Sequence, residues 1–536
     1  MPPAADPALE APERLRFAEL MAVLAAASER AMGQSADQAL QGCALALRLA
    51  RAWGLQGSEL RQVYYLALLR FIGCNAETSL MADIAGDVQA LRRAMAPLDT
   101  ADARRVLSTL YGHVRQAHPG WAATAGALLQ APRFEAEIFP GHCEVAQRLG
   151  RRLGFDERFI AALGQLYARW DGQGVPDDAA DELLPAVRVV QIAQDLVLHG
   201  RLGGWAAAVA VAEERSGAQY DPALVDLALA RGEALLAGLP SRWDDLLELE
   251  PGPQEYLDGA ALEAAFEVLG DYADLQSRWL MAHSRRVAGL VAGASAALGW
   301  PETQQRWLRR AARVHDLGRV AVSTHVWDKA GPLSDSEWDQ VRLHATHTAQ
   351  VLARAPSLAA LARLAGGAHE RGDGSGYAGV TQGSLAARLL AAADVVAALG
   401  EDRPHRAAYP PEVVQGRVTE LVSLGRLDAE AARAVLGQLG LALAPRPLPA
   451  GLSPREAEVL RELAQGLTNK QIAKRLGVSP KTVGHQVEAI YRKAEVNTRA
   501  GATLFALEQG LLGSMGPMGP MGPMGHLPDA GGGRSS

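Results

Sequence analysis

The chain repeats itself, and this repeat constrains the fold more than any other feature. Gly54 and Gly73 fall on Gly299 and Gly318 at a constant offset of 245 residues. Farther along, RWDGQGV at 169–175 matches RGDGSGY at 371–377 at an offset of 202. Apolar residues recur at three- and four-residue spacing in both halves, which is typical of amphipathic helices. The sequence therefore predicts two related helical domains in tandem.

The length of 536 residues is too great for one core and indicates three or four domains. A hydrophobic content of 49% with 21% charged residues is typical of a soluble globular protein, and abundant alanine favours helices. The three cysteines lack CxxC spacing, so we expect reduced core residues. We find no signal-like start and no apolar run of the roughly 18 residues that span a bilayer. These features predict a cytoplasmic, all-α protein without a membrane contact.

An adjacent His315-Asp316 pair closes an apolar helical run in the second half, and Gly318 is placed to end that helix. Neighbouring helical residues point about 100° apart, so both side chains reach one ion only where the helix ends. Histidine and aspartate are good ligands for Fe, Mn, Ni or Zn. Taken alone, however, such a pair is more often a buried hydrogen-bonded pair than a metal site.

More potential ligands surround this pair, in the order H…HD…H…HE-x-x-DGxGY…R-x5-D. This order resembles the HD-GYP subgroup of the HD-domain phosphohydrolases, from about Leu262 to Gly440. The resemblance implies a bundle of five to seven helices around a binuclear metal centre, with cyclic di-GMP as the usual substrate. Position by position, it gives six ligands for one or two divalent ions such as Fe or Mn: His283, His315, Asp316, His344, His369 and Asp394.

In this resemblance Asp316 bridges the two ions, which together activate water and clamp a phosphate during in-line attack. Arg319 stands where the family usually has lysine, and its positive charge is suited to a phosphate. Asp316 and Arg319 are therefore the candidate catalytic residues. Ala368 replaces a histidine of the family, and Trp279 replaces the glutamate of trinuclear members, so a second metal is uncertain and a third is not expected. His347, one turn from His344, is an alternative ligand or a surface residue.

The first half lacks this chemistry. The His-Asp pair corresponds to Arg70-Phe71, and only His142 is a candidate match for His344. The remaining ligand positions hold Gln38, Tyr167 and Gln194, with Asp195 one residue out of register. Phenylalanine and tyrosine at ligand positions cannot hold a divalent ion. The first half therefore reads as a metal-free copy, and a sensory role and a purely structural role both stay open.

The C-terminal segment is basic, with nine Lys/Arg against six Asp/Glu in residues 451–513 of an otherwise acidic chain. Ser453-Pro454-Arg455-Glu456 predicts a capped helix start with a capping box, and Thr468 caps a second helix. Gly477 makes a turn before a third helix that Ser479 caps. This spacing is that of a helix-turn-helix. The segment from Leu452 to about Leu512 resembles the LuxR-type DNA-binding domain; a helical bundle that merely uses these caps is the alternative.

In this geometry the third helix enters the major groove of promoter DNA, and a dimer reads two half-sites. The predicted DNA-contacting residues are Lys470, Ser479, Lys481, Thr482, Gly484, His485 and Glu488.

The whole chain is therefore expected to be all-α, with two HD-domain-like bundles followed by a four-helix LuxR-type domain. The predicted segments are a disordered start (1–13), a degenerate HD-GYP-like domain (14–248), an HD-GYP-like metal-binding domain (254–440), a Pro-rich linker (441–450), the DNA-binding domain (451–513) and a disordered tail (514–536). Two functions fit. In the first, the chain is a homodimeric transcription regulator whose HD-GYP-like domains sense or process a cyclic nucleotide. In the second, residues 254–440 are a metal-dependent phosphodiesterase with an attached DNA-binding domain.

Overall fold

A computed structural model describes residues 12–34, 37–99, 101–130, 137–177, 182–443, 448–509 and 511. These residues form helices and one two-stranded sheet, which confirms the predicted all-α class. The chain divides into two compact units, 1–443 and 444–536. The predicted disordered ends and Pro-rich linker fall largely on residues 1–11, 444–447 and 512–536, which lie outside the described residues. Within the described residues, no helix is long and apolar enough to cross a membrane.

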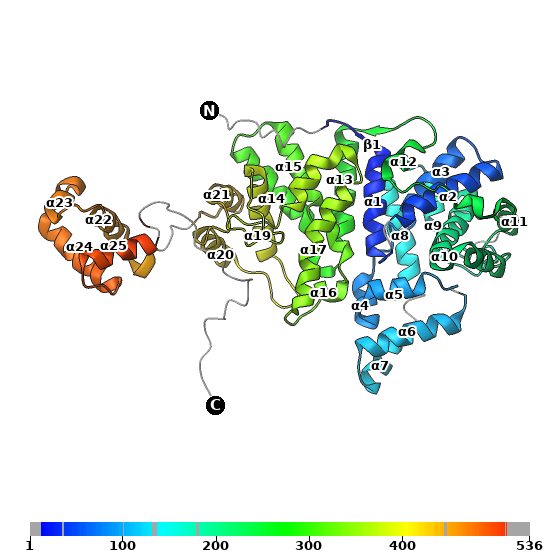
Figure 1. Cartoon of the computed structure of the whole chain (residues 1–536), viewed down its shortest axis with the longest axis horizontal. Helices are drawn as coiled ribbons and strands as arrows, with labels where there is room; N and C mark the ends of the chain where they lie inside the picture. The colour runs from blue at the N-terminus through cyan, green and yellow to red at the C-terminus, as the bar shows by residue number, and fades with distance from the viewer. Residues whose placement is uncertain are drawn as a thin grey trace. The chain divides into compact units, whose positions relative to one another are not determined.

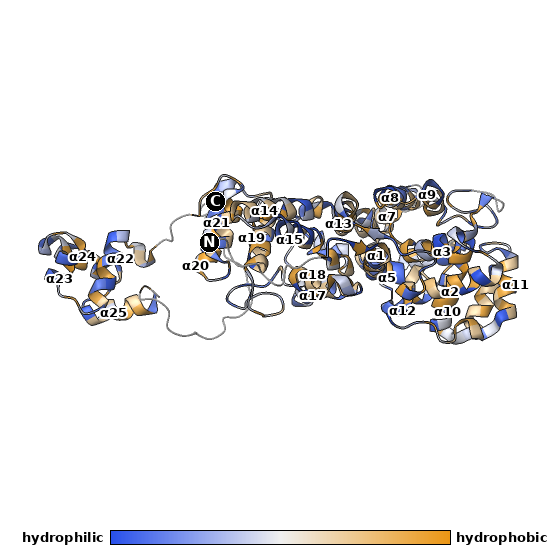
Figure 2. Cartoon of the chain, turned by 90° about the horizontal axis from the view of Figure 1, so that it is seen from above, coloured by the Kyte–Doolittle hydropathy of each residue, from blue (hydrophilic) through white to orange (hydrophobic). Residues whose placement is uncertain are grey.

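The first half of the larger unit consists of a short strand and a series of helices. They are β1 (Leu15–Arg16), α1 (Phe17–Ala31), α2 (Gln38–Trp53), α3 (Ser58–Leu69), α4 (Thr78–Ala85), α5 (Val88–Met95), α6 (Ala103–Ala117), α7 (Trp121–Leu128), α8 (Phe139–Arg152), α9 (Glu157–Gly164), α10 (Pro185–Glu214), α11 (Pro222–Arg231) and α12 (Trp243–Glu248). The apolar residues of α2 and α10, orange in Figure 2, pack these two helices against each other.

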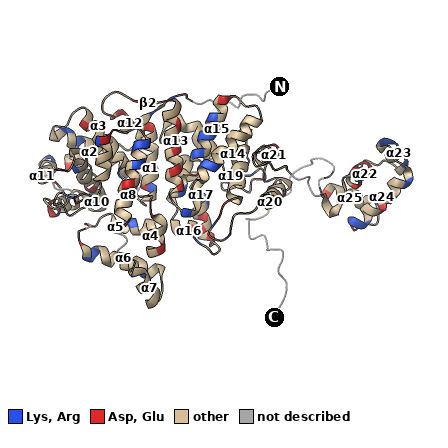
Figure 3. Cartoon of the chain, turned by 180° about the vertical axis from the view of Figure 1, so that it is seen from behind, with Lys and Arg blue, Asp and Glu red and all other residues tan. Residues whose placement is uncertain are grey.

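The second half begins in the same way, with a strand followed by a helix. Its elements are β2 (Tyr256–Leu257), α13 (Gly259–Asp274), α14 (His283–Ala297), α15 (Glu302–Val314), the 3-10 turn η6 (Leu317–Ala321), α16 (Thr324–Trp327), α17 (Asp335–Leu352), α18 (Ala359–Gly366), α19 (Leu385–Leu399), α20 (Pro411–Ser423) and α21 (Ala429–Gly437). Figure 3 shows the acidic residues of α13 beside the basic residues of α15. Arg310 pairs with Glu263 there at 2.7 Å.

The repeat extends to backbone details. Helices α2 and α14 each start after a residue in the left-handed region, Asp37 with φ 71° and Ala282 with φ 63°. A buried carboxylate from the preceding helix caps each start. Glu29 accepts the backbone N–H of Ala39, and Asp274 accepts the N–H and the hydroxyl of Ser284. Glu29 lies 245 residues before Asp274, and Ala39 lies 245 residues before Ser284. The same packing is therefore encoded twice.

The offset falls from 245 to 202 because the first half contains an insertion. Helices α4 to α7 occupy this stretch, where the second half has only α16 and short connections. They build a small apolar cluster of their own around Ile84, Leu91 and Val114. Figure 1 shows α6 and α7 projecting from the bundle.

The two halves pack together with approximate symmetry. Strand β1 pairs antiparallel with β2, with Leu15 opposite Leu257. Helix α1 contacts α17 and η6 of the second half, while α13 contacts α8 of the first. These helices lie side by side in the middle of the larger unit (Figure 1). The first half therefore supports the turn that follows the His315-Asp316 pair.

The smaller unit has its own apolar core. Its helices are α22 (Pro454–Ala464), α23 (Asn469–Leu476), α24 (Pro480–Lys493) and α25 (Arg499–Glu508). The predicted capping box of Ser453 and Glu456 is present, and Thr468 and Gln471 form a second. Gly477, with φ 66°, ends α23 in the left-handed region that glycine tolerates.

Candidate metal centre and nucleic-acid interface

The His315-Asp316 pair lies where α15 ends. The helix stops at Val314, and Asp316 leads into η6 with φ −111°. Both side chains can therefore point to one side, as the sequence predicted. Gly318 does not act as a left-handed helix end. A Cβ there would lie 2.1 Å from the carbonyl oxygen of His344, so glycine is needed because α17 passes so close.

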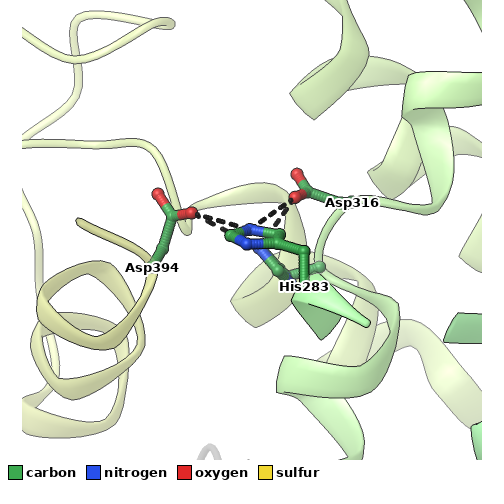
Figure 4. Close-up of side chains that lie close together, drawn as sticks. His283, Asp316 and Asp394 are labelled. Carbon is green, nitrogen blue, oxygen red and sulfur yellow. Dashed lines mark ion pairs between the residues drawn. The ribbon is translucent and has the colours of Figure 1, made fainter. Parts of the chain in front are cut away.

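A first group of candidate ligands converges from α14, α15 and α19. His283, His315, Asp316 and Asp394 are all buried, and their ligand atoms lie within 4.8 Å of one another. Nε2 of His283 is 3.4 Å from Asp316 Oδ2 and 3.3 Å from Asp394 Oδ1. Figure 4 shows the two carboxylates facing the imidazole from opposite sides.

A second group shares Asp316 with the first. Its Oδ1 lies 3.1 Å from His344 Nε2 and 3.0 Å from His369 Nε2. Its Oδ2 faces His283 and His315 instead. One carboxylate therefore presents an oxygen to each group, which is the arrangement that a bridging ligand requires.

These side chains fit a metal ion. The Nε2 atoms of His283 and His315 are buried and make no hydrogen bond of acceptable geometry, although carboxylate oxygens lie nearby. Burial lowers the pKa of both imidazoles, but their contacts with Asp316 and Asp394 outweigh it and raise the values to about 10 and about 9. The negative field that holds a proton on these rings also favours a divalent cation.

The second group has a different electrostatic character. Burial and the neighbouring His369 lower the pKa of His344 to about 4, so its imidazole is neutral. Burial raises the pKa of Asp316, but Arg319 and His315 more than reverse this and hold it well below its usual range. A neutral imidazole and an ionised carboxylate are the forms that bind metals.

Arg319 lies beside the bridging carboxylate. Its Nη2 is 2.6 Å from Asp316 Oδ2, and its guanidinium lies 5.4 Å from the ring centre of Trp327. The residue is only 7% exposed, and its Nε and Nη1 atoms have no hydrogen-bond partner. Leaving buried donors unpaired costs free energy, so Nε and Nη1 favour an anionic partner.

The structure places two residues about which the sequence left alternatives open. His344, not His347, belongs to the second group, and His347 is a half-buried residue outside it. Ala368 is fully buried and offers no donor, so this group holds three donors and the first holds four.

Sequence reasoning missed two buried glutamates. Glu401 contacts Nδ1 of His283 at 2.9 Å, and no motif marks it. Glu370 accepts the backbone N–H groups of Ala378 and Val380, and so braces the loop beside the site. Its place directly after His369 was the only available signal.

The predicted DNA-contacting residues lie on α23 and α24 of the smaller unit, with Ser479 at the start of α24. All of them are exposed except Gly484, which is half-buried, while Val483 and Ile490 of the same helix are buried. Ser479 accepts the backbone N–H of Thr482 at 3.0 Å and caps α24. Parts of the ribbon at α23 and α24 are blue in Figure 3, the colour of Lys and Arg. The exposed start of α24 is the surface that a recognition helix presents.

Two known families match parts of the chain. Residues 267–414 match the HD domain, and residues 450–506 match the bacterial regulatory proteins of the luxR family. The chain thus carries an HD domain and a LuxR-type domain. Both resemblances inferred from the sequence are confirmed.

Known relatives resemble different parts of the chain. A 3'3'-cGAMP-specific phosphodiesterase 3 of Vibrio cholerae is 28% identical over 411 residues, which are 74% of this chain and 88% of that protein. The crystal structure of a cyclic GMP-AMP-specific phosphodiesterase of V. cholerae superimposes with a TM-score of 0.55 at 26% identity, covering 81% of this chain and 99% of the other. The nitrate/nitrite response regulator protein NarP of Escherichia coli is 48% identical over 58 residues, 11% of this chain and 27% of NarP.

The first half differs from the second at the positions that correspond to the candidate ligands. Tyr167 takes the place of His369, and its hydroxyl lies 3.0 Å from His142 Nδ1 and 3.1 Å from Cys74 Sγ. Phe71, in place of Asp316, is half-buried beneath the Arg70 guanidinium. Burial lowers the pKa of His142 to about 3, so this imidazole is neutral. The positions that hold donors in the second half are therefore occupied here by aromatic rings and by a hydrogen-bonded group of His142, Tyr167 and Cys74.

Proposed function

We propose that the chain is a LuxR-type transcription regulator whose HD domain is a metal-dependent phosphodiesterase for cyclic dinucleotides. The observation that carries the proposal is the convergence of two buried donor groups on Asp316. A buried cluster of this composition is costly without a cation, and the same chain presents an exposed recognition helix. Its proposed place of action is the cytoplasm, where promoter DNA lies.

The roles of the six ligands follow from their grouping. His283, His315, Asp316 and Asp394 would hold one ion, and Asp316, His344 and His369 a second. Bound divalent ions such as Fe or Mn would activate water near neutral pH and neutralise phosphate charge. Asp316 is the proposed bridge between the two subsites.

Arg319 is the proposed phosphate-binding residue. Its Nη2 already lies at Asp316, and its unpaired Nε and Nη1 donors are left to hold a non-bridging phosphate oxygen next to the ions. Guanidinium groups suit phosphate because their donors are planar and permanently charged. The similarity to the V. cholerae phosphodiesterases supports a cyclic dinucleotide as the substrate class.

The proposed DNA contacts divide by position. Lys481, Thr482, His485 and Glu488 lie on the exposed face of α24 and would meet bases or the adjoining backbone, while Lys470 on α23 would meet a phosphate. Leu504 and Leu507 of α25 are 54% and 51% exposed. Two such leucines on one helix support a homodimer, which would read two half-sites.

A second candidate function is ligand sensing without hydrolysis. It is favoured by the buried Ala368, which leaves the second donor group with three ligands. A weak second subsite would allow the HD domain to bind a cyclic dinucleotide without cleaving it.

Metal analysis of the purified protein, combined with hydrolysis assays on cyclic di-GMP and 3'3'-cGAMP, tests the proposal. We expect bound transition metal and linear products. Binding of a cyclic dinucleotide without cleavage would favour the sensor. Absence of both metal and dinucleotide binding would overturn both functions.

A further inference from the structure

We propose that Glu401 is a positioning residue that fixes the imidazole of His283 for metal binding and strengthens the first subsite. The proposal rests on the metal centre proposed above. It adds to that centre a residue that itself contacts neither metal nor substrate.

His283 needs a partner at Nδ1 of the kind that His315 and His344 find on their own helices. Nδ1 of His315 lies 2.8 Å from the carbonyl oxygen of Ala312, and Nδ1 of His344 lies 2.5 Å from that of Val341. Each of these carbonyls is three residues earlier on the same helix. His283, in contrast, is the first residue of α14 and follows Ala282 in a left-handed conformation. Because α14 begins at His283, no earlier turn of this helix can hold its ring.

Glu401 fills this gap from another part of the fold. Its two carboxylate oxygens lie 3.1 and 2.9 Å from His283 Nδ1. The ligand Asp394, on α19, lies 3.3 Å from Nε2 of the same ring. Helix α19 and the turn after it therefore hold the imidazole from both sides, which fixes Nε2 toward the metal.

Glu401 is itself firmly held. It is 7% exposed, lies 2.7 Å from Arg403 Nη2 and pairs with Arg286. Two guanidinium groups beside this side chain favour its charged form, so the partner of His283 is a carboxylate rather than a backbone carbonyl. Such a partner makes the imidazole a more basic ligand.

The consequence is an asymmetric centre. The first subsite has four donors and the second has three. One histidine of each has a carboxylate near Nδ1: Glu401 lies 2.9 Å from Nδ1 of His283, and Asp394 lies 3.3 Å from Nδ1 of His369. We infer that the ion at His283 binds more tightly than the ion at His344.

The test is cobalt(II) titration of the metal-stripped full-length protein, followed by the visible absorption of the bound ion. Glu401→Gln keeps the size of the side chain and removes its charge. We expect roughly a 10–100-fold weaker affinity at the tight site and an altered spectrum. Asp402→Asn is the matched control, because this neighbouring carboxylate accepts the N–H of Ala408 and does not contact His283. It should bind cobalt like the wild type.

A purely structural role for Glu401 would change the melting temperature of the metal-free protein and leave the cobalt spectrum unchanged. Wild-type affinity and spectrum in Glu401→Gln would overturn the proposal, and so would equal weakening by Asp402→Asn. If Glu401→Gln does not fold, Glu401→Asp takes its place: we expect weaker binding because the shorter side chain holds the ring less firmly, and wild-type affinity would overturn the proposal. His283→Ala serves as the reference. Unchanged cobalt binding in that variant would refute the metal centre itself.

Discussion

The two halves of the larger unit have corresponding helices but different side chains at the positions of the candidate ligands. A Cβ at Gly73 would lie 1.9 Å from the carbonyl oxygen of His142, and one at Gly318 would lie 2.1 Å from that of His344. Buried carboxylates cap α2 and α14 in the same way. Yet the donors that meet at Asp316 are replaced around Phe71 by aromatic and amide side chains. The scaffold and the ligands are therefore separable, because helix packing does not require the donors.

The comparison also shows what the first half contributes. Its α1 packs against η6, and Gln89 of α5 donates to the carbonyl oxygen of Val320 in that turn. Arg319 lies in the same turn. The first half thus supports the phosphate-binding residue that we propose.

The largest difference between the halves should appear when the two equivalent residues are replaced. Asp316→Ala removes the proposed shared ligand, so we expect loss of bound metal and of dinucleotide hydrolysis with helical content retained. Phe71→Ala should leave metal content unchanged. Because Phe71 is only half-buried, its replacement should cost about 1–3 kcal/mol, less than a fully buried phenylalanine.

Elemental analysis and circular dichroism of both variants check this expectation. Unchanged metal content in Asp316→Ala would contradict the assignment of the ligands. Loss of metal in Phe71→Ala would show that the halves are not independent in their chemistry.

The equivalent glycines test the shared scaffold. Gly73→Ala and Gly318→Ala each place a Cβ against backbone that cannot easily move, so both should lower the free energy of unfolding by about 3 kcal/mol. Only Gly318→Ala displaces His344, and only this variant should lose affinity at the weaker metal subsite. Urea unfolding and cobalt titration measure the two effects. Equal metal affinity in both variants would refute the close link between η6 and His344.

The buried carboxylate of Glu29 predicts a pH dependence in the first half. Burial raises the pKa of Glu29 from 4.5 to about 7. In the unfolded chain this carboxyl ionises near pH 4.5, so its contribution to stability is complete below that pH and is lost as the pH rises through 7. The loss corresponds to about 3 kcal/mol.

In the Glu29→Gln variant the side chain cannot ionise but can still accept the N–H of Ala39. The stability of this variant relative to the wild type should therefore increase between pH 4.5 and 7, which unfolding titrations across this range would measure. A constant difference between the two proteins would show that Glu29 is not perturbed.

The smallest effects concern the DNA-binding domain, where the buried core residues and the exposed residues predicted to contact DNA are again different sets. Lys481→Ala should weaken binding to a selected site by about 1–3 kcal/mol and relax preference at one base position. Lys470→Ala should weaken binding to all sequences alike and reduce the salt slope by about one ion. Titrations at several salt concentrations on selected and random DNA separate the two. Equal losses of affinity on the selected and the random DNA would show that Lys481 does not contact bases.

Much of the site could be predicted because its residues stand in a recognisable order. The order of histidines and aspartates predicted six residues that the structure brings together, although their role as ligands stays a prediction. The capping boxes of α22 and α23 were readable because they depend on residues three positions apart. Local patterns of this kind need no knowledge of the tertiary fold.

Other features depend on contacts between distant segments. Glu401 meets His283 across 118 residues, so no local pattern marks it. The need for glycine at position 318 arises from α17 passing nearby, not from the end of α15. The insertion of α4 to α7 was visible only as a change of offset, because its small core is separate from the repeated bundle.

The most direct test of the central claim is anomalous X-ray diffraction from crystals of the full-length protein grown with manganese or iron. We expect anomalous peaks only in the second half: a strong one between His283 and Asp394, and a second, weaker one between His344 and His369. A peak between Phe71 and Tyr167, or none beside Asp316 in crystals with bound metal elsewhere, would contradict the account.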